Sequence, residues 1–263
     1  MDYAAYTCIR AERAGRVLTL TINRPEVLNA VNAALHEELS RIFYDAAADP
    51  AADVVVLTGA GRAFCAGGDI DWMQEAIDRP ESFEDTAAEA KKIIFGLLDC
   101  EKPIVCRMNG DAVGLGATIA LFCDIVIAAE GARIGDPHVR VGLVAGDGGA
   151  VIWPQLIGFA RAKEFLMTGD LIAAPDAARI GLINHAVPAA ELDAKVAGIV
   201  GKLVNGATKA IRWSKVTANI PLRQLAHSMM DASLAYEVVS NRSADHQEAV
   251  AAFREKRKPR FGR

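Results

Sequence analysis

The sequence predicts an α/β fold with a mostly parallel sheet, followed by a mainly helical C-terminal part. Segments rich in branched apolar residues alternate with segments whose apolar residues recur every three or four positions. Residues 53–58 (DVVVLT) are apolar at nearly every position, which is typical of a strand covered on both faces. From about residue 160 onward, helical periodicity dominates.

The first half of the chain consists of repeated strand–helix–strand units. Such units imply right-handed crossovers and parallel strands. The first predicted helix carries one apolar face at helical spacing, formed by Val31, Leu35, Leu39, Ile42 and Phe43. We expect strands at 16–22, 53–58, 103–107 and 124–128, and further helices at 87–98 and 114–122.

The second half is predicted to be helical apart from one short strand at 183–187. The sequence NGAT at 205–208 interrupts the pattern and marks a boundary. We therefore divide the chain into an α/β core at 1–204 and a helical C-terminal region at 205–263. The expected helices of the second half are 160–167, 174–179, 191–204 and 222–239.

Composition excludes several classes of protein. The chain has 263 residues, of which 52% are hydrophobic, and a formal net charge of -4, so it can bury a large core but lacks the basic excess of a nucleic-acid binder. We expect no signal peptide, because residues 1–10 have no apolar run behind a basic start, and no membrane-spanning helix, because no apolar run is long enough. The five cysteines form no CxxC pair, which favours a cytoplasmic protein without disulfides or a bound metal.

Two glycine-containing segments carry most of the chemical information. They are residues 61–72 (GRAFCAGGDIDW) and 108–124 (MNGDAVGLGATIALFCD), and each follows a predicted strand. One unpaired backbone N–H from each segment could bind a single developing oxyanion. The alternative is that both are ordinary tight turns. Gly114 and Gly116 lack the third glycine of GxGxxG, so a dinucleotide site is not expected.

These segments and four others resemble the crotonase (enoyl-CoA hydratase/isomerase) superfamily, in the same order and over nearly the whole chain. The resemblance implies a spiral of ββα units with a helical C-terminal trimerisation region. It also implies an acyl-CoA substrate and no separate cofactor, because coenzyme A is part of the substrate. The other segments are NRPEVLNAVN at 23–32, GLVAGDGG at 142–149, TGDLIAAPDAARIGLIN at 168–184 and AVAAFREKRKPRF at 249–261.

The resemblance also assigns roles to individual residues. The oxyanion-hole donors should be the backbone N–H groups of Gly68 and Leu115. Leu115 stands where the family often has glycine, but a backbone donor tolerates that change. The resemblance implies coenzyme A binding by Ala66, Asp69, Phe253 and Lys256, and an acyl pocket that includes Trp72, Met73 and Thr118.

The expected catalytic carboxylates are missing. Typical hydratases of the superfamily have glutamates at the positions that match Thr118 and His138. Water addition needs a pair of groups that activate water and manage the α-proton, and threonine cannot act as a base near neutral pH. Ordinary hydratase chemistry is therefore not expected, and an isomerase, a decarboxylase or an atypical hydratase remains open.

His138 and Asp147 form a different candidate pair for proton transfer. Related isomerases, dehalogenases and dehydratases often carry the acid one position earlier, at Gly146. The spacing is similar to that of β-diketone hydrolases of the superfamily, such as 6-oxocamphor hydrolase, which cleave carbon–carbon bonds. A further histidine of that hydrolase has no counterpart near Leu115. A β-diketone hydrolase and a CoA-binding scaffold with little catalysis thus stand as alternatives.

Each candidate residue also has a structural explanation. Asp147 precedes a predicted helix and could cap it, and His138 could be a solvated loop residue. Trp72 and Met73 could be core residues, and the basic tail at 254–263 could be a solvated end. A nucleophilic role for Cys65 is not expected because no base is evident, and His36 is expected on the surface.

We predict a homotrimer or a dimer of trimers. The C-terminal region is apolar enough to pack on a neighbouring subunit through Leu222, Leu225, Met229, Met230 and Leu234. Light scattering at micromolar concentration should therefore give about three or six times the chain mass of 28.0 kDa. A mass equal to that of one chain would refute the prediction.

Overall fold

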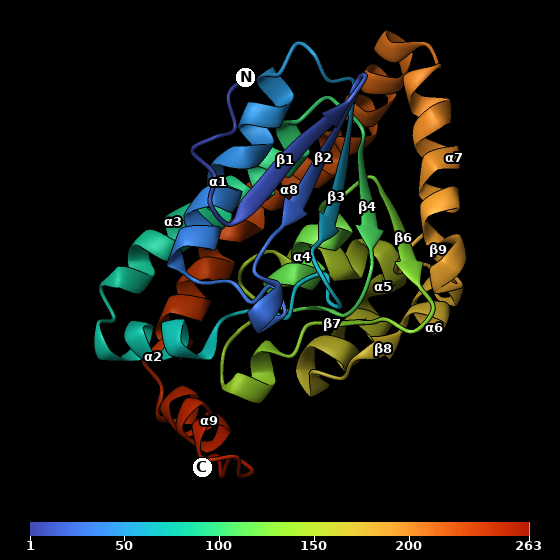
Figure 1. Ribbon diagram of the computed structural model, residues 1–263. Coiled ribbons are helices and arrows are strands. Elements are labelled where there is room, and N and C mark those ends of the chain that lie inside the picture. The colour runs from blue at the N-terminus through green and yellow to red at the C-terminus, as the bar shows by residue number, and fades with distance from the viewer. Residues whose placement is uncertain (263) are drawn as a thin grey trace.

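In the computed structural model, which describes residues 1–262, a six-stranded sheet forms the centre of the fold (Figure 1). The strand order is β1–β2–β3–β4–β6–β9, in which only β1 and β2 pair antiparallel. The predicted mostly parallel sheet is therefore confirmed. The strands are β1 Ile9–Ala14, β2 Val17–Ile22, β3 Val54–Gly59, β4 Ile104–Met108, β6 Ile125–Ala129 and β9 His185–Val187.

Helices cover both faces of this sheet (Figure 1). Successive side chains of a strand point to opposite faces. Val55 accordingly lies in the core shared with α1 (Ala33–Ala48) and α3 (Ser82–Asp99), whereas Val54 lies in the core shared with α7 (Leu192–Val204). The continuous apolar run of β3 reflects this double burial.

A second, three-stranded sheet begins just beyond the carboxyl ends of β4 and β6, because only short connections separate the two sheets. Its order is β5–β7–β8, and helices α4, η2 and α5 follow its strands in the chain. In α/β folds, ligands bind outside the carboxyl ends of parallel strands. The bounds of these elements are β5 Ala112–Val113, β7 Arg133–Gly135, β8 Ile172–Ala173, α4 Leu115–Phe122, η2 His138–Val141 and α5 Gly149–Thr168.

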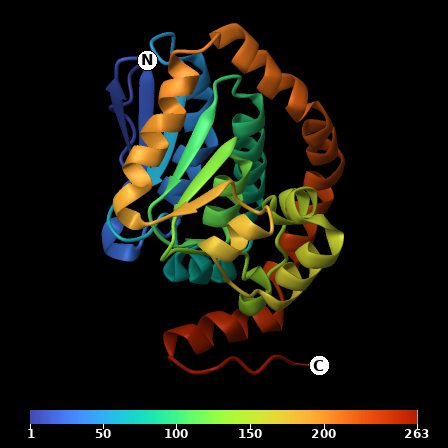
Figure 2. The same cartoon turned by 90° about the vertical axis from the view of Figure 1, so that its right-hand side faces the viewer.

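The C-terminal helices pack on their own chain. Helix α8 (Thr208–Asn241) runs along α3, and α9 (Ala244–Arg254) crosses one end of the molecule, where it contacts α2 (Ile70–Asp78) and η2 (Figure 2). Met230 and Leu234 are therefore buried within the chain. Leu222, Leu225 and Met229 also pack against this core. The apolar residues that we expected at a subunit contact thus face α3 and the core. Exposed apolar side chains on α8 are instead Trp213, Ile220, Tyr236 and Val239.

Several elements are longer than predicted or were not predicted. The helices expected at 160–167 and 222–239 are parts of α5 and α8, and α6 occupies Ala174–Arg179 as expected. The first half of α5 was not predicted because Pro154 and Gly158 normally interrupt helices; Gly158 has φ 77°. Strand β1 (IRAERA) was missed because charged side chains interrupt its apolar pattern. Among the described residues, no helix is both long and apolar enough to span a membrane.

We predict that Gly116→Ala lowers stability. A Cβ at this position would lie 2.6 Å from the Cβ and 2.6 Å from the carbonyl oxygen of Cys65, so the two segments would have to separate. Such overpacking costs about 1–3 kcal/mol. The matched control is Gly198→Ala in α7, where a Cβ meets nothing within 4 Å; it should stabilise by about 0.5–1 kcal/mol. Urea unfolding at one protein concentration measures both, and equal stability of the two variants would contradict the prediction.

Candidate active site

The two glycine segments lie against each other. Cys65 and Ala112 form an isolated parallel bridge, in which the Val113 N–H donates to the Cys65 carbonyl at 2.9 Å. Gly67 (φ 87°) and Gly114 (φ 55°) adopt left-handed backbone conformations where the segments are closest, and these conformations favour glycine. Segments that lie far apart in the sequence are thereby held in one fixed arrangement.

This arrangement leaves two backbone donors unpaired. Gly68 forms a parallel bridge with Val31. The Val31 N–H donates to the Gly67 carbonyl at 2.7 Å, and the Val31 carbonyl accepts from the Asp69 N–H at 2.9 Å. The N–H of Gly68 itself therefore points away from Val31. Leu115 begins α4, and the first N–H groups of a helix have no partner within it. Neither N–H donates to an acceptor within residues 1–262. Both residues line the same cavity.

A small inner cavity and a larger outer groove meet beside these donors. The cavity has a volume of about 70 Å³ and the groove about 510 Å³. Gly68, Met73 and His138 line both spaces. A ligand that lies in the groove can therefore extend into the cavity past the two N–H groups.

The other predicted binding residues are distributed over and around these spaces. Trp72 lines the cavity beside Met73. Thr118 does not line either space; it is fully buried. Lys256 is exposed and lies outside the groove lining. Of the residues predicted to bind coenzyme A, those that line the groove are Ala66, Asp69 and Phe253.

His138 stands between two carboxyl groups. Its Nδ1 hydrogen-bonds Asp136 Oδ1, and its Nε2 lies 3.6 Å from Asp147 Oδ2. Burial lowers the pKa of His138, but the two carboxylates outweigh burial and hold this pKa well above 6.5. The side chain is 12% exposed, so it is a charged residue of the cavity wall and not a solvated loop histidine.

Asp147 has partners on two sides. Thr118 Oγ1 donates to its Oδ1 at 3.3 Å, and His138 faces its Oδ2. Burial raises the pKa of Asp147 above its ordinary value, and the nearby His138 charge offsets only part of this rise. The cap position of α5 is Gly148, and no side chain caps this helix. The Gly149 N–H lies near enough to lower the pKa of Asp147, but helix capping does not explain its contacts with the cavity.

Glu237 brings a further carboxyl group to the cavity, and the sequence had not singled it out. It projects from α8 and is 7% exposed. Burial raises its pKa to about 8, and the charge of Asp147 adds to this effect. The only sequence signal is the helical spacing of three and four from Leu234 to Glu237 and Asn241, which puts Glu237 on the same face as an apolar residue but does not say what that face meets.

Two other predicted residues have clear surroundings. His36, expected on the surface, is instead 2% exposed: its Nδ1 lies 2.6 Å from Glu89 Oε2, and its ring packs on Trp72. The reason is that α3 packs along α1 and that Trp72 of α2 lies on the His36 ring. Cys65 is fully buried, and burial raises its thiol pKa to about 11, so it is not an activated nucleophile.

Asp136, His138 and Asp147 offer ligand atoms that all lie within 4.8 Å of one another, close enough for a metal ion. The imidazole, however, directs one nitrogen to each carboxylate. Hydrogen bonding and charge attraction account for these contacts, and the expectation that no metal is bound stays a prediction.

Fold and site together define an α/β protein with a groove, a small cavity and a buried group of ionisable side chains at their junction. A family model described as enoyl-CoA hydratase/isomerase matches residues 12–263. The chain therefore belongs to the enoyl-CoA hydratase/isomerase family, and the resemblance to the crotonase superfamily and its fold is confirmed.

Individual relatives span nearly the whole chain. A protein named crotonyl-CoA hydratase from Syntrophomonas wolfei is 36% identical over 259 residues, which are 98% of each chain. The crystal structure of an enoyl-CoA hydratase/isomerase from Mycobacterium paratuberculosis superposes with a TM-score of 0.91 at 36% identity, covering 95% of this chain and 99% of the other. A β-diketone hydrolase from Anabaena sp. PCC 7120 superposes with a TM-score of 0.84 at 28% identity, covering 90% and 95%.

We predict that Glu237→Gln makes the protein progressively more stable than the parent as pH rises from 5 to 8. The unfolded carboxyl loses its proton near the ordinary pKa of 4.5, whereas the folded one keeps it up to about 8. Between these values the unfolded state binds fewer protons, so folding stability of the parent falls with rising pH, by at most about 1.4 kcal/mol per pH unit. Glutamine removes this dependence.

Urea unfolding of both proteins at one concentration, at pH 5.5 and 7.5, measures the effect. Glu164→Gln, at an exposed position, is the control and should show no such trend. A stability difference between Glu237→Gln and the parent that stays constant with pH would show that the Glu237 carboxyl is ionised in the folded protein.

Proposed function

We propose that this protein is an acyl-CoA enzyme that forms the enolate of a short thioester. The Gly68 and Leu115 N–H groups serve as the oxyanion hole, and Asp147, assisted by His138, accepts the α-proton. The observation that carries the proposal is that two unpaired backbone donors and these two side chains line one cavity at the inner end of a groove.

The charges of the site suit this chemistry. Asp147 removes the α-proton, and the electron pair moves onto the thioester oxygen, where the two N–H groups stabilise it. His138, positively charged between two carboxylates, lowers the pKa of Asp147 and so favours its proton-accepting form, partly offsetting the effect of burial. Glu237 holds a proton at neutral pH and can return it at another carbon; one proton then passes between the two carboxyls to restore the site. This sequence is an isomerisation, and a decarboxylase or an atypical hydratase would share the enolate.

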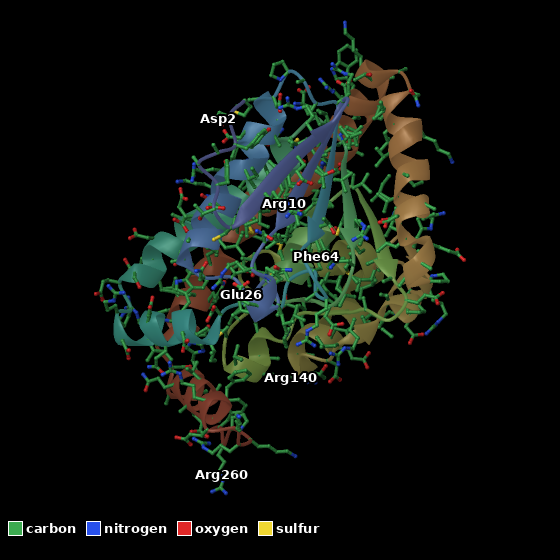
Figure 3. All side chains as sticks on the ribbon, in the orientation of Figure 1. Asp2, Arg10, Glu26, Phe64, Arg140 and Arg260 are labelled. Atoms are coloured by element: carbon green, nitrogen blue, oxygen red, sulfur yellow. The ribbon has the colours of Figure 1, made fainter. Side chains whose placement is uncertain are left out.

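The groove suits coenzyme A. Phe253 offers an exposed ring for an adenine, and Arg140 lines the groove. Figure 3 shows Arg140, which is paired with Asp170, and Arg260 toward the end of the molecule that carries α9, so two arginines bring positive charge to that end. We place Lys256 in a phosphate-binding role. The name of the Syntrophomonas wolfei relative, crotonyl-CoA hydratase, supports a short acyl-CoA substrate.

We extend the proposal to the setting of the enzyme. We infer a homotrimer or a dimer of trimers in the cytoplasm, without nucleic-acid partners. Exposed apolar side chains on α8 support assembly, and the free state of all five cysteines suits a reducing compartment.

A β-diketone hydrolase is the second candidate. The Anabaena relative is described as bound to (S)-3-oxocyclohexyl acetic acid, a cyclic compound. A cavity of about 150 Å³ holds benzene in another protein, whereas the inner cavity here measures about 70 Å³. The smaller volume favours a short linear acyl group. Cleavage of a cyclic β-diketone without coenzyme A would favour the hydrolase instead.

We predict that the protein exchanges the α-protons of butyryl-CoA with D₂O, and that Asp147→Asn slows this exchange at least about a hundredfold. Exchange reports enolate formation whichever reaction follows it. Asparagine keeps the shape of aspartate and an oxygen for the Thr118 hydroxyl, but it cannot accept the proton. Loss of a positioned base costs about 10²–10⁴-fold. NMR or mass spectrometry measures the exchange.

Thermal unfolding should show little change for Asp147→Asn, and Asp176→Asn at an exposed position is the matched control, with full activity. Equal exchange by the parent and Asp147→Asn would remove Asp147 from the mechanism. A parent protein that binds butyryl-CoA without exchange would support the third alternative, a scaffold with little catalysis.

A further inference from the structure

The inner cavity is apolar over most of its wall but polar where the C-terminal helices close it. Asn241 at the end of α8 and His246 in α9 line the cavity together with Glu237. Asn241 is 2% exposed and His246 is fully buried. Polar groups with so little access to water normally have hydrogen-bond partners.

Each of these side chains has one atom without a partner among residues 1–262: Asn241 Oδ1, His246 Nε2 and Glu237 Oε2. Three such atoms on residues that line one small cavity are unusual, because an unpaired buried polar group is costly. A ligand that enters the cavity is therefore expected to supply hydrogen bonds.

The hydrogen bonds made by the other polar atom of Asn241 and of His246 show whether the free atom is a donor or an acceptor. The Asn241 side chain contacts the carbonyl oxygen of Ala76 at 3.1 Å, which must receive an N–H, so its free atom is the acceptor oxygen. His246 Nδ1 lies 2.6 Å from the carbonyl oxygen of Val141, so Nδ1 carries the hydrogen. Burial lowers the pKa of His246, so the ring is neutral and its free Nε2 is also an acceptor.

We propose that the closed end of the cavity selects a short acyl group that carries a hydroxyl beyond the thioester, with Asn241 Oδ1 and His246 Nε2 sharing its single hydrogen. A hydrocarbon end would leave both acceptors unpaired. A terminal carboxylate has only hydrogen-bond acceptors, so it could not bond Asn241 Oδ1 or His246 Nε2. The negative charge of Asp147 would also repel it. A hydroxyl supplies the donor that both of these ends lack, and its oxygen can accept a hydrogen bond from the protonated Glu237 carboxyl. This inference rests on the proposed acyl-CoA function.

Calorimetric binding to the parent protein tests the selection. We expect 4-hydroxybutyryl-CoA or 5-hydroxypentanoyl-CoA to bind about tenfold to a hundredfold more tightly than butyryl-CoA or pentanoyl-CoA, respectively, and succinyl-CoA to bind more weakly than butyryl-CoA. Two chain lengths are used so that the hydroxyl reaches the acceptors in one of them. If neither hydroxylated thioester binds more tightly than its matched alkyl thioester, the inference is overturned.

Asn241→Leu should abolish most of the preference, and Asn205→Leu, the same substitution at an exposed position of the chain, should retain it. Retention of the full preference by Asn241→Leu would refute the role of Asn241. Because the parent measurement needs no variant, a folding defect of Asn241→Leu leaves the test intact. Failure of every thioester to bind would instead refute the proposed function, so the two failures are distinguishable.

Discussion

The close approach of the two glycine segments is the constraint on which the rest of the site depends. Gly116 meets Cys65 at a distance that no side chain at 116 would permit, and the Cys65–Ala112 bridge locks the contact. Both unpaired donors, those of Gly68 and Leu115, sit within three residues of this bridge. Any shift between the segments would change the separation of the donors, and electrostatic stabilisation of an oxyanion depends on such fixed geometry.

Buried charge is the second constraint. Asp136 and Asp147 are buried near the N-terminus of α5, which carries a partial positive charge. Asp136 approaches this end closely, since a Cβ at Gly149 would lie only 2.0 Å from Asp136 Oδ2. The imidazolium of His138 between the carboxylates supplies the remaining compensation. Because charges buried without partners are strongly unfavourable, these groups are interdependent. The same low-polarity surroundings raise the pKa of Glu237 to about 8.

The sequence predicted the fold well because its strongest signals are local. The continuous apolar sequence of β3 reflects burial on both of its faces, and the single apolar stripe of α1 reflects burial on one face. Residues that line the cavity were predictable only where they belong to a sequence motif, as do Gly68, Leu115, His138 and Asp147; their roles stay predictions. Glu237 lies 90 positions after Asp147 in the chain, and no local pattern indicates which buried face of α8 meets the cavity. His36 was misplaced for a similar reason, since its covering helix is α3.

The place of Glu237 gives a physical reason for the glycine at 146, where the family resemblance led us to expect an acid in isomerases and dehydratases. A Cβ at Gly146 would lie 2.7 Å from Glu237 Oε2 and 2.5 Å from the carbonyl oxygen of Ser233, so α8 already fills the space that a side chain there would need. The carboxyl group therefore reaches this region from a different helix. Chemistry constrains where a carboxyl group lies, not which segment supplies it. A glycine at 146 and a buried glutamate at 237 are consequently one structural choice, and neither residue can be interpreted alone.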